Sequence, residues 1–260
     1  MQQISPTIET PVAAGQPWLG WTQEIEAARE VQERLLYREP PQFQALKYSS
    51  CCLPAKGVGG DYCDFIELKN HQLVLAVGDI SGKGISAALM MAHLQASVRT
   101  LYATTETGLA PLLQSVNRLF LAATAPAHYA TLFVGEYDDR SGTLRYANCG
   151  HNAPLLVHSD CTVERLQPTA TVLGLFENWE CSTSEVRLVP GDTLVLFTDG
   201  VTEATNANGE EFGEQRLIDR LRIFRASPPC SLVEGIVRTA QEFSGHRQRD
   251  DLTVAVARAN

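Results

Sequence analysis

The sequence lacks any apolar run of the roughly 18–20 residues that a membrane-spanning helix needs. Residues 1–20 also lack the Lys or Arg that opens a secretory signal. Basic residues are not in excess, because 21 Lys and Arg stand against 30 Asp and Glu, for a net charge of −9. A general nucleic-acid binder needs a basic surface. We therefore expect a cytoplasmic protein that binds neither a membrane nor nucleic acid.

Paired cysteines are missing as well. The seven cysteines are odd in number and none forms a C-x-x-C pair, so neither a disulfide framework nor a structural zinc site is expected. A G-x-S-x-G motif is absent, which argues against a Ser-His-Asp hydrolase. What the chain does have is 44% hydrophobic residues over 260 positions, enough to bury a substantial core.

The pattern along the chain divides it into three segments. Residues 1–16, with three Pro or Gly and little apolar pattern, are expected to be a flexible arm. Residues 17–42 are predicted to hold an N-terminal regulatory or dimerisation helix that Pro40 and Pro41 terminate. Residues 43–260 are expected to form one domain. One helical face within the second segment carries Trp21, Ile25, Ala28, Val31 and Leu35. That face either packs on the main domain or binds a partner, so a trans-acting regulator or a homodimer is possible.

Strand and helix signals mix within residues 43–260. Strands are expected over 62–68, 73–80, 130–137, 143–148, 154–158, 162–166, 182–188, 193–198 and 252–257. Helices are expected over 85–102, 111–123, 214–224 and 231–243. The helix over 85–102 is apolar on nearly every side, so we expect it to be buried. Hairpin-like pairs interrupted by helix pairs favour an α+β fold of stacked antiparallel sheets with helices outside.

Aspartates stand at the ends of three strongly apolar strands. Asp79 follows the strand that begins at Leu73, Asp199 follows the strand that ends at Thr198, and Asp250 and Asp251 precede the last strand. If these acids converge on one sheet edge, the last strand must run antiparallel to the other two. A hairpin turning at Asn70 and His71 would add a fourth acid, because it places Asp61 opposite about Ile80.

Four carboxylates at one edge would repel one another. Each pair at ~4 Å costs on the order of 4 kcal/mol at an effective dielectric near 20, so protonation or a cation must relieve the repulsion. Oxygen-only ligands select Mg²⁺ or Mn²⁺ over zinc. Two such ions can share a water, lower its pKa and present hydroxide to a phosphorus centre. The alternative is that each aspartate merely caps a turn.

The run from Gly78 to Gly84 resembles a phosphate-binding P-loop but departs from it. Only three residues separate Gly78 from Gly82, where the motif has four, and Gly84 replaces the Ser or Thr that holds Mg²⁺. Nucleotide binding is therefore not expected here.

Taken together, six blocks resemble the PPM family (protein phosphatase 2C-like), in particular bacterial serine phosphatases of the stage II sporulation E / RsbU type. They appear in family order over about residues 22–258, which makes the match specific. The blocks are Pro54-Ala55 with 58–65 (VGGDYCDF), 78–84 (GDISGKG), 148–154 (NCGHNAP), 196–204 (LFTDGVTEA), 209–213 (GEEFG) and 250–254 (DDLTV).

This resemblance implies an αββα sandwich, two mainly antiparallel sheets flanked by helix pairs, with two Mn²⁺ or Mg²⁺ ions between the sheets. It implies that Asp79 bridges both ions with help from the Ile80 carbonyl. Asp61 would hold one ion, and Asp199 and Asp250 the other. It also implies that Asp251, at a position where the wider family often has Asn, supports these ligands without binding an ion.

Two positions depart from the family pattern. Lys56 stands about where other members use an Arg to bind phosphate, so it is a candidate phosphate ligand without the bidentate fork. Ser81-Gly82-Lys83 replaces the His that many members carry as a proposed general acid, which leaves that role unassigned. Lys83 itself could reach the ions or cap the following helix, and we expect the cap.

The implied function is that of a metal-dependent protein serine/threonine phosphatase. The expected substrate is a phosphorylated STAS-type anti-anti-sigma factor in a partner-switching pathway. Two alternatives remain: a non-catalytic pseudophosphatase that holds a phosphoprotein, and a metal-dependent hydrolase of small phosphoesters. The roughly 40 residues before the core cannot house a sensor domain, so control is expected from a separate partner on the helix or the arm.

Overall fold

The computed structural model describes residues 18–36, 43, 45–69 and 71–260. The arm predicted over residues 1–16 lies outside the described residues, as does the stretch 37–42. In the described part of the chain, no helix combines the length and the apolar character needed to cross a membrane.

Two five-stranded antiparallel sheets stack face to face. The first has the order β1-β10-β9-β6-β7, with bounds β1 Leu46–Leu53, β10 Leu252–Ala259, β9 Thr193–Phe197, β6 Leu155–Val157 and β7 Val163–Arg165. The second has the order β2-β3-β4-β5-β8, with bounds β2 Tyr62–Leu68, β3 Gln72–Ile80, β4 Ala130–Asp138, β5 Thr143–Cys149 and β8 Ser184–Arg187.

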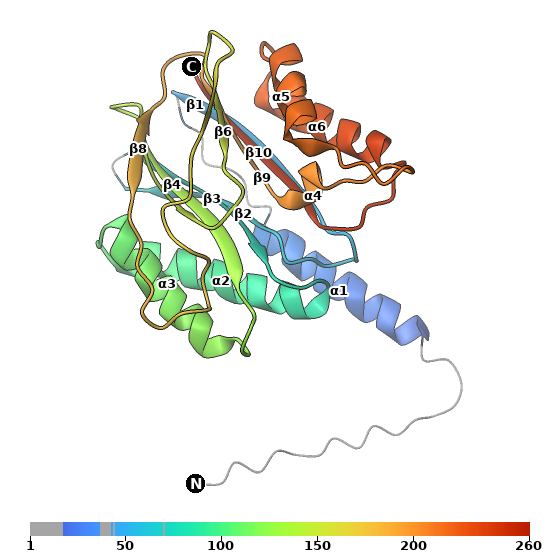
Figure 1. The fold of residues 1–260 in the computed structure, drawn as a ribbon. Helices are drawn as coiled ribbons and strands as arrows, with labels where there is room; N and C mark the ends of the chain where they lie inside the picture. Colours follow the sequence, from blue (N-terminus) through green and yellow to red (C-terminus); the bar gives the residue numbers. More distant parts are fainter. Residues whose placement is uncertain (1–17, 37–42, 44, 70) are drawn as a thin grey trace.

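Helices cover the outer face of each sheet, as Figure 1 shows. The β2-β3-β4-β5-β8 sheet carries α2 (Ile85–Thr104) and α3 (Leu109–Ala123), and the other sheet carries α5 (Gly213–Ile223) and α6 (Pro229–Phe243). A single turn, α4 (Asp199–Thr202), follows β9. The αββα sandwich and its antiparallel sheets are therefore confirmed.

The central strands are apolar throughout because both of their faces are buried. In β3, Val74 and Ala76 face the helices, whereas Leu73, Leu75 and Val77 face the second sheet. Side chains alternate across a strand, so one continuous apolar run supplies two layers of core. The same alternation in β10 sends Val254 and Val256 outward and Ala255 and Ala257 between the sheets.

Every strand and helix predicted from the sequence is present with closely similar bounds. The sequence pattern missed β1, a mixed polar and apolar strand of sequence LKYSSCCL at the edge of its sheet. The expectation that α2 is buried on nearly every side is wrong. Ala87, Met91 and Leu94 lie on its buried face, whereas Leu89 on the opposite face is 67% exposed.

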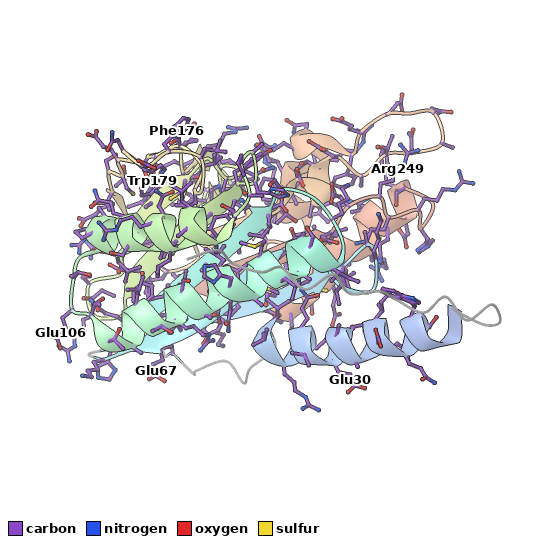
Figure 2. The ribbon with its side chains drawn as sticks, turned by 90° about the horizontal axis from the view of Figure 1, so that it is seen from below. Glu30, Glu67, Glu106, Phe176, Trp179 and Arg249 are labelled. Carbon is purple, nitrogen blue, oxygen red and sulfur yellow. The ribbon has the colours of Figure 1, made fainter. Side chains whose placement is uncertain are left out.

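The N-terminal helix is confirmed as α1 (Trp18–Leu36), which lies beside α2 with Glu30 pointing away from the body (Figure 2). Its apolar face packs on the main domain only in part. Trp21 is 59% exposed and Val31 58%, whereas Ile25 lies against Gly57. Among the α1 side chains that the structure describes, the fully buried one is the polar Gln32.

Candidate active site

The predicted aspartates gather at one end of the stacked sheets. Tyr62 pairs with Gly78, so Asp61 lies next to Asp79, one residue from the partner expected from the hairpin. The last strand, β10, runs antiparallel to β9, as expected. The expectation of a single sheet edge is wrong, however. Asp61 and Asp79 belong to one sheet and Asp199 and Asp250 to the other, so the acids face one another across the sandwich.

A buried hydroxyl joins the two sheets at this end. Thr198, directly before Asp199, donates its Oγ1 hydrogen to Asp61 Oδ2 at 2.9 Å. Thr198 Oγ1 also accepts a hydrogen bond from the backbone N of Thr253 at 3.0 Å. Asp61 and Thr198 are 3% and 0% exposed, so this bond fixes one acid against the opposite sheet. Nothing in the sequence pattern marks Thr198 beyond its place before Asp199.

The pKa values of these acids show how closely they face one another. Burial, then the charges of Asp199 and Asp250, raises the pKa of Asp79 to about 7. Burial and the charge of Asp79 raise the pKa of Asp61 well above its ordinary value. Burial and the charge of Asp250 raise the pKa of Asp199. The acids therefore form one repulsive cluster, as the strand-end pattern predicted.

The donors at this end suit a hard divalent cation. They are carboxylate oxygens, together with the Ile80 carbonyl, which lies 3.0 Å from where a Cβ on Gly60 would be. Such donors favour Mg²⁺ or Mn²⁺. Among the described residues, no three Asp, Glu, His or Cys side chains are arranged to hold one ion as they stand. The site thus has the right donor type and excess negative charge, and its carboxylates must turn to enclose an ion.

Asp251 organises the loop that carries Asp61. It accepts hydrogen bonds from the backbone N of Ala55 at 2.7 Å and of Gly60 at 2.6 Å, and it is 4% exposed. Its carboxylate lies so close to Gly59 that a Cβ there would be 2.3 Å from Oδ2. These contacts fit the supporting role predicted for Asp251, since both of its oxygens are occupied by backbone donors.

The two lysines singled out from the sequence lie in different surroundings. Lys83 does not cap α2, contrary to the expectation. Its Nζ donates to Asp250 Oδ2 at 2.6 Å and to the Arg249 carbonyl at 2.9 Å. Burial lowers the pKa of Lys83, but its hydrogen bond to Asp250 and the charges of Asp250 and Asp199 raise it overall. Lys56 is exposed, and its role as a phosphate ligand stays a prediction.

Comparison with known proteins agrees with this geometry. The family model for stage II sporulation protein E (SpoIIE) matches residues 69–260. Phosphoserine phosphatase RsbU of Bacillus subtilis (strain 168) is 33% identical over 241 residues, which cover 90% of this chain and 70% of RsbU.

Two solved structures share the fold. The SiaA-PP2C domain of Pseudomonas aeruginosa has a TM-score of 0.80 at 23% identity, covering 93% of this chain and 98% of that one. The more distant catalytic domain of the serine/threonine phosphatase PstP, solved in complex with 2 manganese ions, has a TM-score of 0.62 at 14% identity over 82% of this chain and 98% of that one. The chain therefore belongs to the SpoIIE family and has the fold of PP2C-type phosphatase domains.

Proposed function

We propose that this chain hydrolyses phosphoserine or phosphothreonine on a protein, using two Mn²⁺ or Mg²⁺ ions held by Asp61, Asp79, Asp199 and Asp250. One observation carries the proposal. Four carboxylates, two from each sheet, share one end of the sandwich at a high electrostatic cost, and burial and mutual repulsion raise the pKa values of three of them. A fold keeps such a cluster only where a cation or a proton offsets the repulsion.

Each residue would have a distinct task. Asp79 has the charges of Asp199 and Asp250 around it and would bridge the two ions with the Ile80 carbonyl beside it. Asp61, held by Thr198, would anchor one ion from its own sheet, and Asp199 and Asp250 would anchor the other. Asp251 would fix the Gly60 loop behind Asp61. Bound divalent ions supply Lewis acidity, which lowers the pKa of water and offsets the charge developing on phosphorus.

We further propose a phosphorylated STAS-type anti-anti-sigma factor as the substrate. The support is membership of the SpoIIE family together with the similarity to a protein named phosphoserine phosphatase RsbU. All four predicted ligands are present, which disfavours the pseudophosphatase alternative.

The test is turnover of a panel of phosphorylated STAS proteins and of p-nitrophenyl phosphate, at equal enzyme, with Mn²⁺ or with EDTA. We expect Mn²⁺-dependent release of phosphate, with kcat/KM far higher for at least one STAS protein. Full activity in EDTA would end the metal proposal. Equal or better turnover of p-nitrophenyl phosphate would favour the small-phosphoester alternative.

We also propose that residues 17–42 regulate the site through α1. Gln32 Nε2 donates to the Gly59 carbonyl at 2.7 Å, and the Gly59 N donates back to Gln32 Oε1 at 3.0 Å. Gly59 lies two residues before Asp61, so α1 is hydrogen-bonded to the loop that carries a candidate ligand. A cavity of about 280 Å³ between α1 and this loop reaches Asp61 and Asp251. A regulator or a second copy on the exposed Trp21 and Val31 could act through this contact.

A further inference from the structure

Lys83 spans the two sheets at the acidic end. It lies in the loop between β3 and α2, where Gly82 and Gly84 both have positive φ, at 101° and 76°. Its ammonium crosses to the residues that precede β10, where it bonds to Asp250 and to the Arg249 carbonyl. The side chains of Lys83 and Asp250 are 41% and 34% exposed, so this contact lies at the mouth of the site.

The positive charge of Lys83 loses its carboxylate partner once divalent ions bind. Asp61, Asp79, Asp199 and Asp250 together carry four negative charges, which two divalent cations would balance. The nearby Asp251 has both of its oxygens on backbone N–H donors and so offers Lys83 no replacement. Asp250 cannot then also serve as the counter-ion of Lys83, because a divalent cation competes for the carboxylate and repels the ammonium. The ammonium needs a new anionic partner, and a phosphate ester brings up to two negative charges to the same place.

We propose that Lys83 is a phosphate-binding residue whose ammonium passes from Asp250 to an oxygen of the substrate's phosphoryl group. This inference rests on the proposed function and deepens it. A lysine suits the task because its flexible stem moves a compact charge. The space beside Gly82 and Gly84 is open, since a Cβ at either would meet nothing within 4 Å. Lys83 would then be the phosphate ligand, the role that the sequence analysis assigned to Lys56.

The experiment compares Lys83→Met and Lys83→Arg with Lys56→Met and with a control, Lys47→Met, which removes an exposed lysine from β1. Isothermal calorimetry measures binding of Mn²⁺ to EDTA-stripped, dialysed protein, and then binding of inorganic phosphate to the Mn²⁺-loaded protein. Thermal melting in EDTA reports on the fold of each variant.

For Lys83→Met we expect Mn²⁺ to bind about threefold more tightly, because a competing cation is removed. We expect inorganic phosphate to bind roughly tenfold or more weakly, because a charge-assisted hydrogen bond is lost. Lys83→Arg should keep phosphate affinity within about threefold of wild type, since the positive charge remains. Lys47→Met should change neither affinity.

Four outcomes would overturn the inference. Unchanged phosphate affinity in Lys83→Met, with Mn²⁺ binding intact, would refute phosphate binding by Lys83. It would leave the proposed function unaffected. A joint fall of both affinities and of the melting temperature, not restored by Arg, would make Lys83 a structural link between the sheets. A loss of phosphate affinity in Lys56→Met instead would return the role to Lys56. Failure of the wild-type protein to bind Mn²⁺ at all would sink the proposed function and this inference together.

Discussion

At the scale of single residues, the main feature is a set of carboxylates whose ionised form is disfavoured by burial and by one another. The pKa of Asp79 is raised to about 7 by burial and by Asp199 and Asp250. A carboxyl whose pKa is higher in the folded than in the unfolded state binds its proton more tightly when folded. Its stabilising contribution is therefore fully present below its unfolded pKa and lost as the pH rises through its folded pKa.

Ionisation of Asp79 should therefore destabilise the metal-free protein. In EDTA, the free energy of unfolding of wild type should fall between pH 4 and about 7 as Asp79 ionises. Asp79→Asn carries no charge there, so its melting temperature should equal or exceed that of wild type at pH 7 and above, although its phosphatase activity is abolished. Calorimetric melting across this range checks both. A matched control is Asp219→Asn, which removes an exposed carboxylate on α5, away from the acidic cluster. A melting temperature for Asp79→Asn well below wild type at pH 8 would contradict the repulsive cluster.

The sequence was sufficient to find these acids. Asp79, Asp199 and Asp250 stand at the ends of apolar strands, and the hairpin spacing adds Asp61. It could not place Lys83, because the partner of Lys83 lies more than 160 positions away along the chain. Nor could it identify Thr198 or Gln32, whose roles depend on hydrogen bonds between distant segments. Local pattern reveals which residues end a strand but not what they meet across the sandwich.

At the scale of elements, the glycines of the motifs allow close approach of backbone segments. A Cβ on Gly200, at the start of α4, would lie 1.9 Å from the Asp251 carbonyl oxygen and 3.4 Å from the Asp250 Cβ. Both neighbours precede β10, so α4 and β10 can adjoin only if residue 200 has no side chain. The turn that begins with Asp199 is thereby held against the strand that follows Asp250.

Gly200→Ala should therefore destabilise the protein strongly. Overpacking commonly costs about 1–3 kcal/mol, and here the clash is with backbone, so we expect the upper end of that range or more. Urea unfolding of Gly200→Ala checks this against Gly108→Ala, where the added Cβ meets only Pro111 Cδ at 4.0 Å and the change should stay within ~0.5 kcal/mol. Similar midpoints for the two variants would show that the neighbouring backbone yields.

The contact of α1 with the Gly59 loop can also be tested by substitution. Gln32→Ala leaves the Gly59 N–H and carbonyl without these partners, so the loop should open more often. We expect faster amide hydrogen exchange at Gly59 and Gly60 and weaker Mn²⁺ binding. Glu30→Gln, on the face of α1 that points away from the body (Figure 2), is the control and should leave both unchanged. Wild-type exchange rates in Gln32→Ala would show that α1 does not hold this loop.

At the scale of the whole molecule, periodicity and hairpin spacing were enough to predict two antiparallel sheets with helices outside. They could not assign strands to sheets. Sequence neighbours such as β5 and β6 lie in different sheets, whereas β1 and β10, at opposite ends of the domain, pair along their full length. Such pairing depends on which apolar faces fit each other, and β1 was missed because its own pattern is weak.

Divalent ions should stabilise the molecule as a whole, because their proposed ligands come from both sheets. A ligand that binds only the folded state adds RT ln(1 + [L]/Kd), or ~2.7 kcal/mol at a hundred times Kd. Mn²⁺ at that level should raise the melting temperature of wild type and have little effect on Asp79→Asn. An unchanged wild-type melting temperature, with activity intact in EDTA, would refute the metal site.

The central place of β10 between β1 and β9 has a consequence for biosynthesis. This strand leaves the ribosome after every other described element, yet it completes one sheet and brings Asp250 to the site. A nascent chain that ends before Asp250 has β1 and β9 without their shared neighbour, and it has only three of the four acids. Catalytic competence should thus arise only once β10 has emerged, and a chain truncated before β10 should be inert rather than partly active.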